Sequence, residues 1–177
     1  NAFEKLRVGP AAMDLDLGPL IRQSQQQRVW DFLSDAQVAN IPMVAQGQVV
    51  DEAPETGFYQ APTLLRDVPV EHRLAQEEVF GPVLSAMSFR DEDEAMHQAN
   101  ATQFGLVAGI WTRDGARQFR MAKRVKSGQV FINNYGAGGG RSSLPPPGFC
   151  SRAASTWDRT STRPCWHAVT VASRCRL

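Results

Sequence analysis

The residues best suited to chemistry lie in one short run, in which two adjacent carboxylates, Glu77 and Glu78, precede Phe80 and then Gly81 and Pro82. Glycine tolerates backbone angles that other residues avoid, and a proline disfavours helix at the position before it. We therefore expect the glutamates to lie in a turn at the mouth of a strand, where α/β proteins hold ligands. The residues alone indicate a carboxylate and an aromatic ring that project from a strand end. A solvated turn with a core phenylalanine is the alternative.

Cysteine and histidine are too few and too scattered to suggest a metal or redox site. The three cysteines, Cys150, Cys165 and Cys175, match neither a Cys-x-x-Cys zinc pair nor a redox motif. His72 and His97 are isolated and lack metal-ligand spacing. We therefore expect no metal site, and we interpret the cysteines as free thiols in a poorly ordered tail.

Two further runs have both a functional and a structural interpretation. Residues 136–140 form a glycine-rich loop after an expected strand, but Arg141 occupies the last glycine position of a G-x-G-x-x-G motif and no helix pattern follows. We favour a flexible loop over a phosphate site. The four acids at residues 91–94 are interpreted as a helix start that complements the helix dipole, and not as a metal site.

The elements that must position these residues alternate between strand and helix patterns. We expect strands over residues 83–89, 106–111 and 129–133, with helices that begin at Asp91 and Asp114 between them. This β-α-β-α-β order is typical of an α/β fold with a parallel sheet and right-handed crossovers. It places Glu78, Gly105 and Asn133 at strand ends, but the sequence does not show which edge of the sheet each one occupies.

Apolar spacing predicts the buried faces of the helices. An earlier helix is expected to start with a capping box at Ser24, while residues 1–6 resemble the end of a helix whose start is missing. The side chains expected to face inward are Val29, Phe32, Leu33 and Ala36 in the earlier helix, Ala95, Met96 and Ala99 in the next, and Phe119, Ala122 and Val125 in the last.

The charge distribution divides the chain near residue 140. Residues 1–140 carry 13 basic and 17 acidic side chains, a net charge of −4, whereas residues 141–177 carry 6 and 1, a net charge of +5. The second segment has no sustained period apart from a strand-like run at 167–172. We expect one domain over residues 1–140 and an irregular or disordered tail over 141–177 that arose by a frameshift or a fusion.

Composition also excludes several classes of protein. Trp157 and Trp166 lie in the basic tail, but without a fold or an aromatic-basic period we expect no nucleic-acid binding. The chain has no signal-peptide pattern and no apolar run near the roughly 18 residues of a membrane span. We therefore expect a cytoplasmic protein without membrane contact.

Several runs, in the same order, resemble the aldehyde dehydrogenase superfamily. The central one reads Glu-Glu-Val-Phe-Gly-Pro-Val at residues 77–83. The others are residues 6–10 with 17–21, 57–65, 100–114 and 127–134. The resemblance covers residues 1 to about 140, and it implies an incomplete catalytic domain of an NAD(P)-dependent enzyme that oxidises an aldehyde to a carboxylic acid.

The resemblance assigns cofactor contacts but no catalytic residue to this chain. It implies that Glu78 hydrogen-bonds the ribose hydroxyls of the nicotinamide half and that Phe80 packs beside the nicotinamide ring; a structural turn carboxylate is the alternative for Glu78. The nucleophilic cysteine, its activating base and the cofactor domain precede these motifs in the family and are absent here. We expect a fragment that is inactive alone and binds neither NAD nor NADP by itself.

A different class of function remains open. The chain is alternatively a non-catalytic remnant or interaction module that pairs with full-length subunits through an open sheet edge. Loss of a partner domain leaves apolar surface uncovered, so we also expect self-association or a homo-oligomer.

Overall fold

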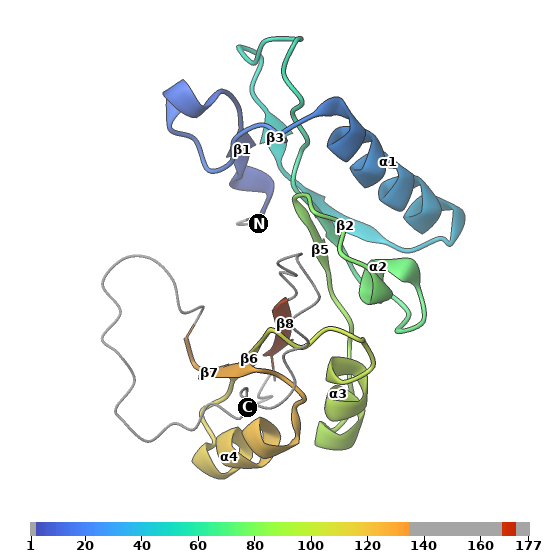
Figure 1. The fold of residues 1–177 in the computed structure, drawn as a ribbon, viewed down its shortest axis with the longest axis vertical. Coiled ribbons are helices and arrows are strands. Elements are labelled where there is room, and N and C mark those ends of the chain that lie inside the picture. The colour runs from blue at the N-terminus through green and yellow to red at the C-terminus, as the bar shows by residue number, and fades with distance from the viewer. Residues whose placement is uncertain (1–2, 135–167, 173–177) are drawn as a thin grey trace, which may run out of the picture. The chain divides into compact units, whose positions relative to one another are not determined.

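Two compact units, Asn1–Ser88 and Phe89–Leu177, make up the chain in the computed structural model, which describes residues 3–134 and 168–172 (Figure 1). Each unit combines parallel strands with helices. The α/β class with parallel pairing, predicted from the sequence, is therefore confirmed.

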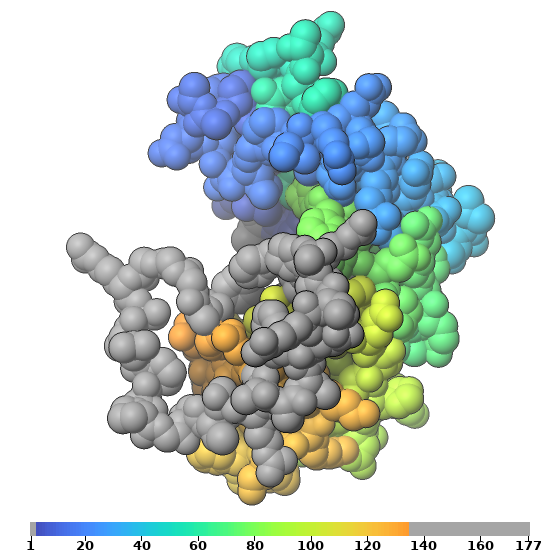
Figure 2. Space-filling model, viewed as in Figure 1, coloured from blue at the N-terminus to red at the C-terminus, as the bar shows by residue number. Residues whose placement is uncertain are grey.

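The first unit contains a mixed three-stranded sheet and a long helix. Its short 3-10 helices are η1 (Phe3–Lys5) and η2 (Ala11–Met13), and its α-helices are α1 (Gln23–Val38) and α2 (Arg73–Gln76). Its strands are β1 (Arg7–Val8), β2 (Met43–Gln46), β3 (Gln48–Val49), β4 (Thr63–Leu65) and β5 (Val83–Ser85). The main sheet has the order β2-β4-β5, with β2 antiparallel and β5 parallel to β4, while β1 pairs in parallel with β3. The turn-rich segment after β3 projects from this unit (Figure 2).

The second unit is built around a parallel sheet with β6 at its centre. Its elements are α3 (Glu92–Ala99), β6 (Val107–Trp111), α4 (Gly115–Arg124), β7 (Gln129–Ile132) and β8 (Ala168–Ala172). The sheet has the order β7-β6-β8, and both outer strands run parallel to β6. The strands expected at 83–89 and 106–111 therefore lie in different sheets. β5, within the first range, pairs with β4, whereas β6, within the second, pairs with β7 and β8. β8 lies within the strand-like run at 167–172.

Each unit has its own apolar core, largely on the helical faces that the spacing predicts. Buried side chains of the first core are Phe32, Ala36, Ile41, Leu65, Val68, Leu74 and Ala75. Those of the second are Ala95, Met96, Ala99, Ala108, Ile110, Met121 and Val125. The buried stripes predicted for α1 and α3 are therefore confirmed, except that Leu33 is only partly buried.

Two helix predictions are wrong in detail. The predicted burial of Phe119 is contradicted, because this residue is 56% exposed and Met121 is buried instead. At about 100° per residue these two positions lie roughly 200° apart around the helix, so they cannot share a face. The capping box at Ser24 is also absent: α1 starts at Gln23, and its N-cap Arg22 makes no side-chain capping bond.

None of the helices within the described ranges combines the length and the apolar character needed to cross a membrane.

Candidate cofactor-binding turn

The candidate site is the turn at residues 77–82, which joins α2 to β5. His72 caps α2 by accepting a hydrogen bond at Nδ1 from the Leu74 N–H at 3.2 Å, and Glu77 follows the helix with extended backbone. Glu78 and Phe80 therefore precede the amino end of β5. The rule that ligands bind at carboxyl ends of parallel strands does not support this turn. The turn is a candidate site because of its own backbone and hydrogen-bond geometry.

The backbone of the turn is unusual at Phe80 and tightly packed at Gly81. Phe80 has φ 56°, in the left-handed region that non-glycine residues seldom adopt. Gly81 is not left-handed, contrary to the reason the sequence suggested for it. A Cβ on Gly81 would lie 2.4 Å from Cγ2 of Val29, a buried residue of α1. The glycine is therefore required by the close approach of the helix.

Two side chains of α1 bind three consecutive carbonyl groups of the turn. Gln25 Nε2 donates to the carbonyl oxygens of Val79 at 2.9 Å and Phe80 at 2.8 Å. Arg28 Nη2 donates to the carbonyl oxygen of Glu78 at 2.6 Å. Neither residue was among the candidates predicted from the sequence. The available signal was their i, i+3 spacing, which places two long donors on one face of the helix.

The two adjacent glutamates have different surroundings. Glu77 forms ion pairs with Arg28 at 3.7 Å and Arg73 at 3.5 Å. Both guanidinium groups also lie over the ring of Phe32, at 4.9 and 3.9 Å from its centroid. Glu77 therefore belongs to a structural cluster beneath the turn. Glu78 is half-buried, and its Oε1 atom is withdrawn from solvent.

Asp35 completes this cluster by accepting a hydrogen bond from Arg73 Nη1. That bond, followed by the attraction of Glu77 and Asp35, outweighs partial desolvation and raises the pKa of Arg73 above its ordinary value. Arg73 thus stays a cation that binds both carboxylates.

The other two strand-end residues lie at opposite ends of the parallel strands of the second sheet. Asn133 follows the carboxyl end of β7, and Gly105 precedes the amino end of β6. At Gly105 a Cβ would lie 2.8 Å from the carbonyl oxygen of Lys126, so the chain passes too close there for a side chain.

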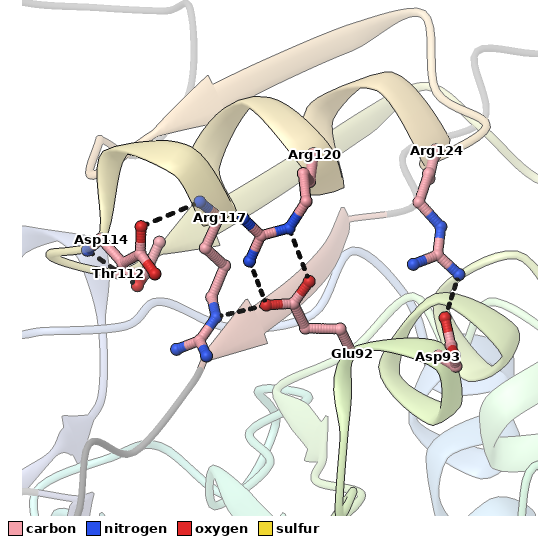
Figure 3. Close-up of polar contacts among 7 residues, drawn as sticks. All are labelled: Glu92, Asp93, Thr112, Asp114, Arg117, Arg120 and Arg124. Atoms are coloured by element: carbon pink, nitrogen blue, oxygen red, sulfur yellow. Dashed lines mark hydrogen bonds and ion pairs between the residues drawn. The ribbon is translucent and has the colours of Figure 1, made fainter.

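The acidic run at residues 91–94 does more than begin a helix. The predicted cap is confirmed, because Asp91 Oδ1 accepts the Glu94 N–H at 2.8 Å. Glu92 and Asp93, however, form ion pairs with three arginines of α4 (Figure 3). Glu92 accepts from Arg117 Nε and Arg120 Nη2, each at 2.7 Å.

These contacts perturb the titration of Glu92. Hydrogen bonds from Arg120 first and Arg117 second lower the pKa of Glu92 to about 2. Among the described residues, no group of three or more histidine, cysteine, aspartate or glutamate side chains is arranged to hold a metal ion. Cys150, Cys165, Cys175, Trp157, Trp166 and the loop at 136–140 lie outside those residues.

Comparisons with known proteins agree with this architecture. The sequence model of the aldehyde dehydrogenase family matches residues 1–170. The crystal structure of a putative aldehyde dehydrogenase from Burkholderia cenocepacia is 75% identical, with a TM-score of 0.76 over 78% of this chain and 29% of that one. An aldehyde dehydrogenase from Didymella fabae is 40% identical over 67% of this chain and 24% of its own length.

A further solved structure carries a cofactor. The 1-pyrroline-5-carboxylate dehydrogenase from Thermus, crystallised with bound NAD, is 33% identical, with a TM-score of 0.68 over 75% of this chain and 25% of that one.

The matches define an α/β segment of dehydrogenase type. The chain belongs to the aldehyde dehydrogenase family. It spans about a quarter of the length of the relatives it matches. The family match runs past residue 140, and the separate origin of residues 141–177 stays a prediction.

Proposed function

We propose that this chain supplies the nicotinamide-ribose contact of an NAD(P)-dependent aldehyde dehydrogenase, with Glu78 and Phe80 as the cofactor-binding residues. When bound, the nicotinamide accepts hydride as an aldehyde and water become a carboxylate. The structure with bound NAD in a relative that is 33% identical supports this class of cofactor.

The observation that carries the proposal is that Phe80 is exposed and has a left-handed backbone. The residue is 55% exposed, so it adds little to the core. Its left-handed backbone, at φ 56°, costs about 1–2 kcal/mol for a residue with a Cβ. An exposed aromatic ring on a strained backbone is better explained by a ligand contact than by folding.

Glu78 has the chemistry that a ribose contact requires. An ionised carboxylate has about four lone-pair acceptor sites on its two oxygens, enough for the two hydroxyl donors of a vicinal diol even though Oε1 of Glu78 is withdrawn from solvent. Its main chain is held by Arg28 through the 2.6 Å bond to its carbonyl oxygen. Glu77 already serves two arginines and is less suited to this role.

The 177 residues by themselves are proposed not to turn over aldehyde. An acyl-transfer route needs a thiolate nucleophile. No cysteine precedes Cys150 in this sequence, and all three cysteines follow the 77–82 turn. Turnover above background by the purified chain would contradict this part of the proposal.

The cofactor role is tested in a complete enzyme. Residues 3–134 replace the matching segment of the Burkholderia cenocepacia protein, and Glu78→Gln is compared with Glu77→Gln. We expect Glu78→Gln to raise the KM for NAD⁺ by about 10-fold, because a charged hydrogen-bond acceptor is lost, and Glu77→Gln to change it much less. Equal effects of the two substitutions would refute the assignment.

The second candidate function is an interaction module. It is favoured by β5, which has a described partner strand on one side only, and by Leu84 on that strand, a residue that is 52% exposed. Exposed edges of this kind pair readily with another chain. The test is whether the 177-residue chain co-elutes with a full-length homologue. Co-elution that Leu84→Lys abolishes would favour the interaction module over the role in an enzyme.

A further inference from the structure

We propose that Gln25 and Arg28 of α1 are positioning residues that set the backbone of residues 78–80 for cofactor binding. The inference rests on the proposed function of Glu78 and Phe80. It explains the geometry of the turn. The sequence of the turn does not itself account for the left-handed backbone of Phe80, and contacts from α1 do.

The contacts restrain the turn at three successive peptide groups. Gln25 Nε2 lies 2.9 Å from the Val79 oxygen and 2.8 Å from the Phe80 oxygen, and Arg28 Nη2 lies 2.6 Å from the Glu78 oxygen. Rotation about φ of Phe80 toward an ordinary value would move these oxygens away from their donors. The hydrogen bonds therefore oppose relaxation of the strained residue.

The Arg28 donor is itself held by other contacts. The Arg28 guanidinium lies 4.9 Å from the centroid of Phe32, a fully buried ring, and 3.7 Å from Glu77 Oε2. One residue after Arg28 on the helix, Val29 lies so close to Gly81 that no Cβ fits there. The turn is thus held by hydrogen bonds on its carbonyl groups and by van der Waals contact at its glycine.

The variants follow from the chemistry of the donors. Gln25→Glu keeps the shape of the side chain but replaces an amide donor with an acceptor, which repels the carbonyl oxygens of Val79 and Phe80. Gln25→Leu removes the donor without adding charge, and serves if Gln25→Glu does not fold. Gln27→Glu is the matched control, because Gln27 is exposed on the same helix and its amide donates to Asp31.

The first measurement is hydrogen exchange on the folded 177-residue chain. The Glu77 and Val83 amides flank the turn and donate to the carbonyl oxygens of Arg73 and Gly81, at 2.8 and 2.7 Å. We expect Gln25→Glu or Gln25→Leu to speed their exchange by about 10-fold, a loss equivalent to one or two net hydrogen bonds. Gln27→Glu leaves the exchange unchanged. Unchanged exchange in both Gln25 variants would overturn the proposal.

The second measurement is steady-state kinetics of the complete enzyme that carries residues 3–134. We expect the Gln25 variants to raise the KM for NAD⁺ by about 5- to 10-fold with little change in kcat at saturating NAD⁺ or in the KM for aldehyde. Arg28→Lys, which retains a charged donor, should raise the KM for NAD⁺ less than Arg28→Met does. A general loss of structure would lower kcat as well and would not follow this order.

The outcomes separate this inference from the proposed function. Faster exchange with an unchanged KM for NAD⁺ would overturn the positioning role. If the Glu78→Gln substitution leaves that KM unchanged while the Gln25 variants raise it, the assignment of Glu78 fails and the positioning role of α1 stands.

Discussion

The side-chain amide of Asn133 forms two hydrogen bonds with the backbone of Thr112, each 3.0 Å long. Oδ1 accepts from the Thr112 N–H, and Nδ2 donates to the Thr112 oxygen. The same oxygen also accepts from Gln118 Nε2 at 2.8 Å. The Asn133 amide thereby joins the ends of β6 and β7, and the Thr112 oxygen that it shares with Gln118 adds α4 to this junction. Asn133 itself has a left-handed backbone at φ 50°.

Two substitutions of Asn133 are expected to distinguish the stability that its side-chain hydrogen bonds contribute from the cost of its left-handed backbone. Asn133→Gly loses the two bonds but accepts a positive φ, and we expect a loss of about 1 kcal/mol in the free energy of unfolding. Asn133→Ala also pays the left-handed strain, for a loss of about 2–3 kcal/mol. Urea denaturation followed by circular dichroism measures both. Equal losses would show that the backbone conformation contributes little.

Even a methyl side chain at position 81 is expected to lower the free energy of unfolding. Gly81→Ala places a Cβ 2.4 Å from Val29 Cγ2, so the helix or the turn must shift. Overpacking of this kind costs about 1–3 kcal/mol. Gly115→Ala is the control, because a Cβ at Gly115, the first residue of α4, meets nothing within 4 Å.

A double-mutant cycle locates the cause of the Gly81 effect. Val29→Ala removes the atom that the new Cβ would meet, so Gly81→Ala should cost clearly less in that background. Thermal or urea denaturation of the four proteins gives the coupling free energy. Additive losses would show that the contact with Val29 is not the reason for the glycine.

The second unit is expected to lose stability in acid through Glu92. Pairing with Arg120 and Arg117 lowers the pKa of Glu92 from an ordinary value of 4.5 to about 2. Because the folded pKa is depressed, the pairing stabilises the folded state above pH 4.5, and this contribution is lost as the pH falls toward 2. Glu94 and Asp114, whose pKa values are also lowered, act in the same direction.

Comparison with Glu92→Gln isolates the contribution of this one carboxylate. The denaturation midpoint of the native sequence should exceed that of the variant at about pH 6, and the two should converge near pH 2. Added salt at about 1 M should narrow the difference at pH 6, because it screens partly exposed ion pairs. Midpoints that stay a constant distance apart over this range would contradict the role of the ion pairs.

Features that depend on neighbours along the chain could be predicted from the residues alone. The caps at Asp91 and Asp114, the buried stripe of Val29, Phe32 and Ala36, and the alternation of strands and helices arise from interactions within one turn of helix or from the period of a single element. The resemblance to the aldehyde dehydrogenases came from the same local runs, and the family match confirms it.

The residues that hold the candidate site in place could not be predicted in this way, because they come from distant parts of the chain. Arg28 and the carbonyl group of Glu78 are 50 positions apart in the sequence, and no local pattern indicates that they are bonded. The same holds for Val29 against Gly81 and for Glu92 against Arg120. These partners meet because buried apolar faces bring their elements together, and that packing depends on the whole of each unit.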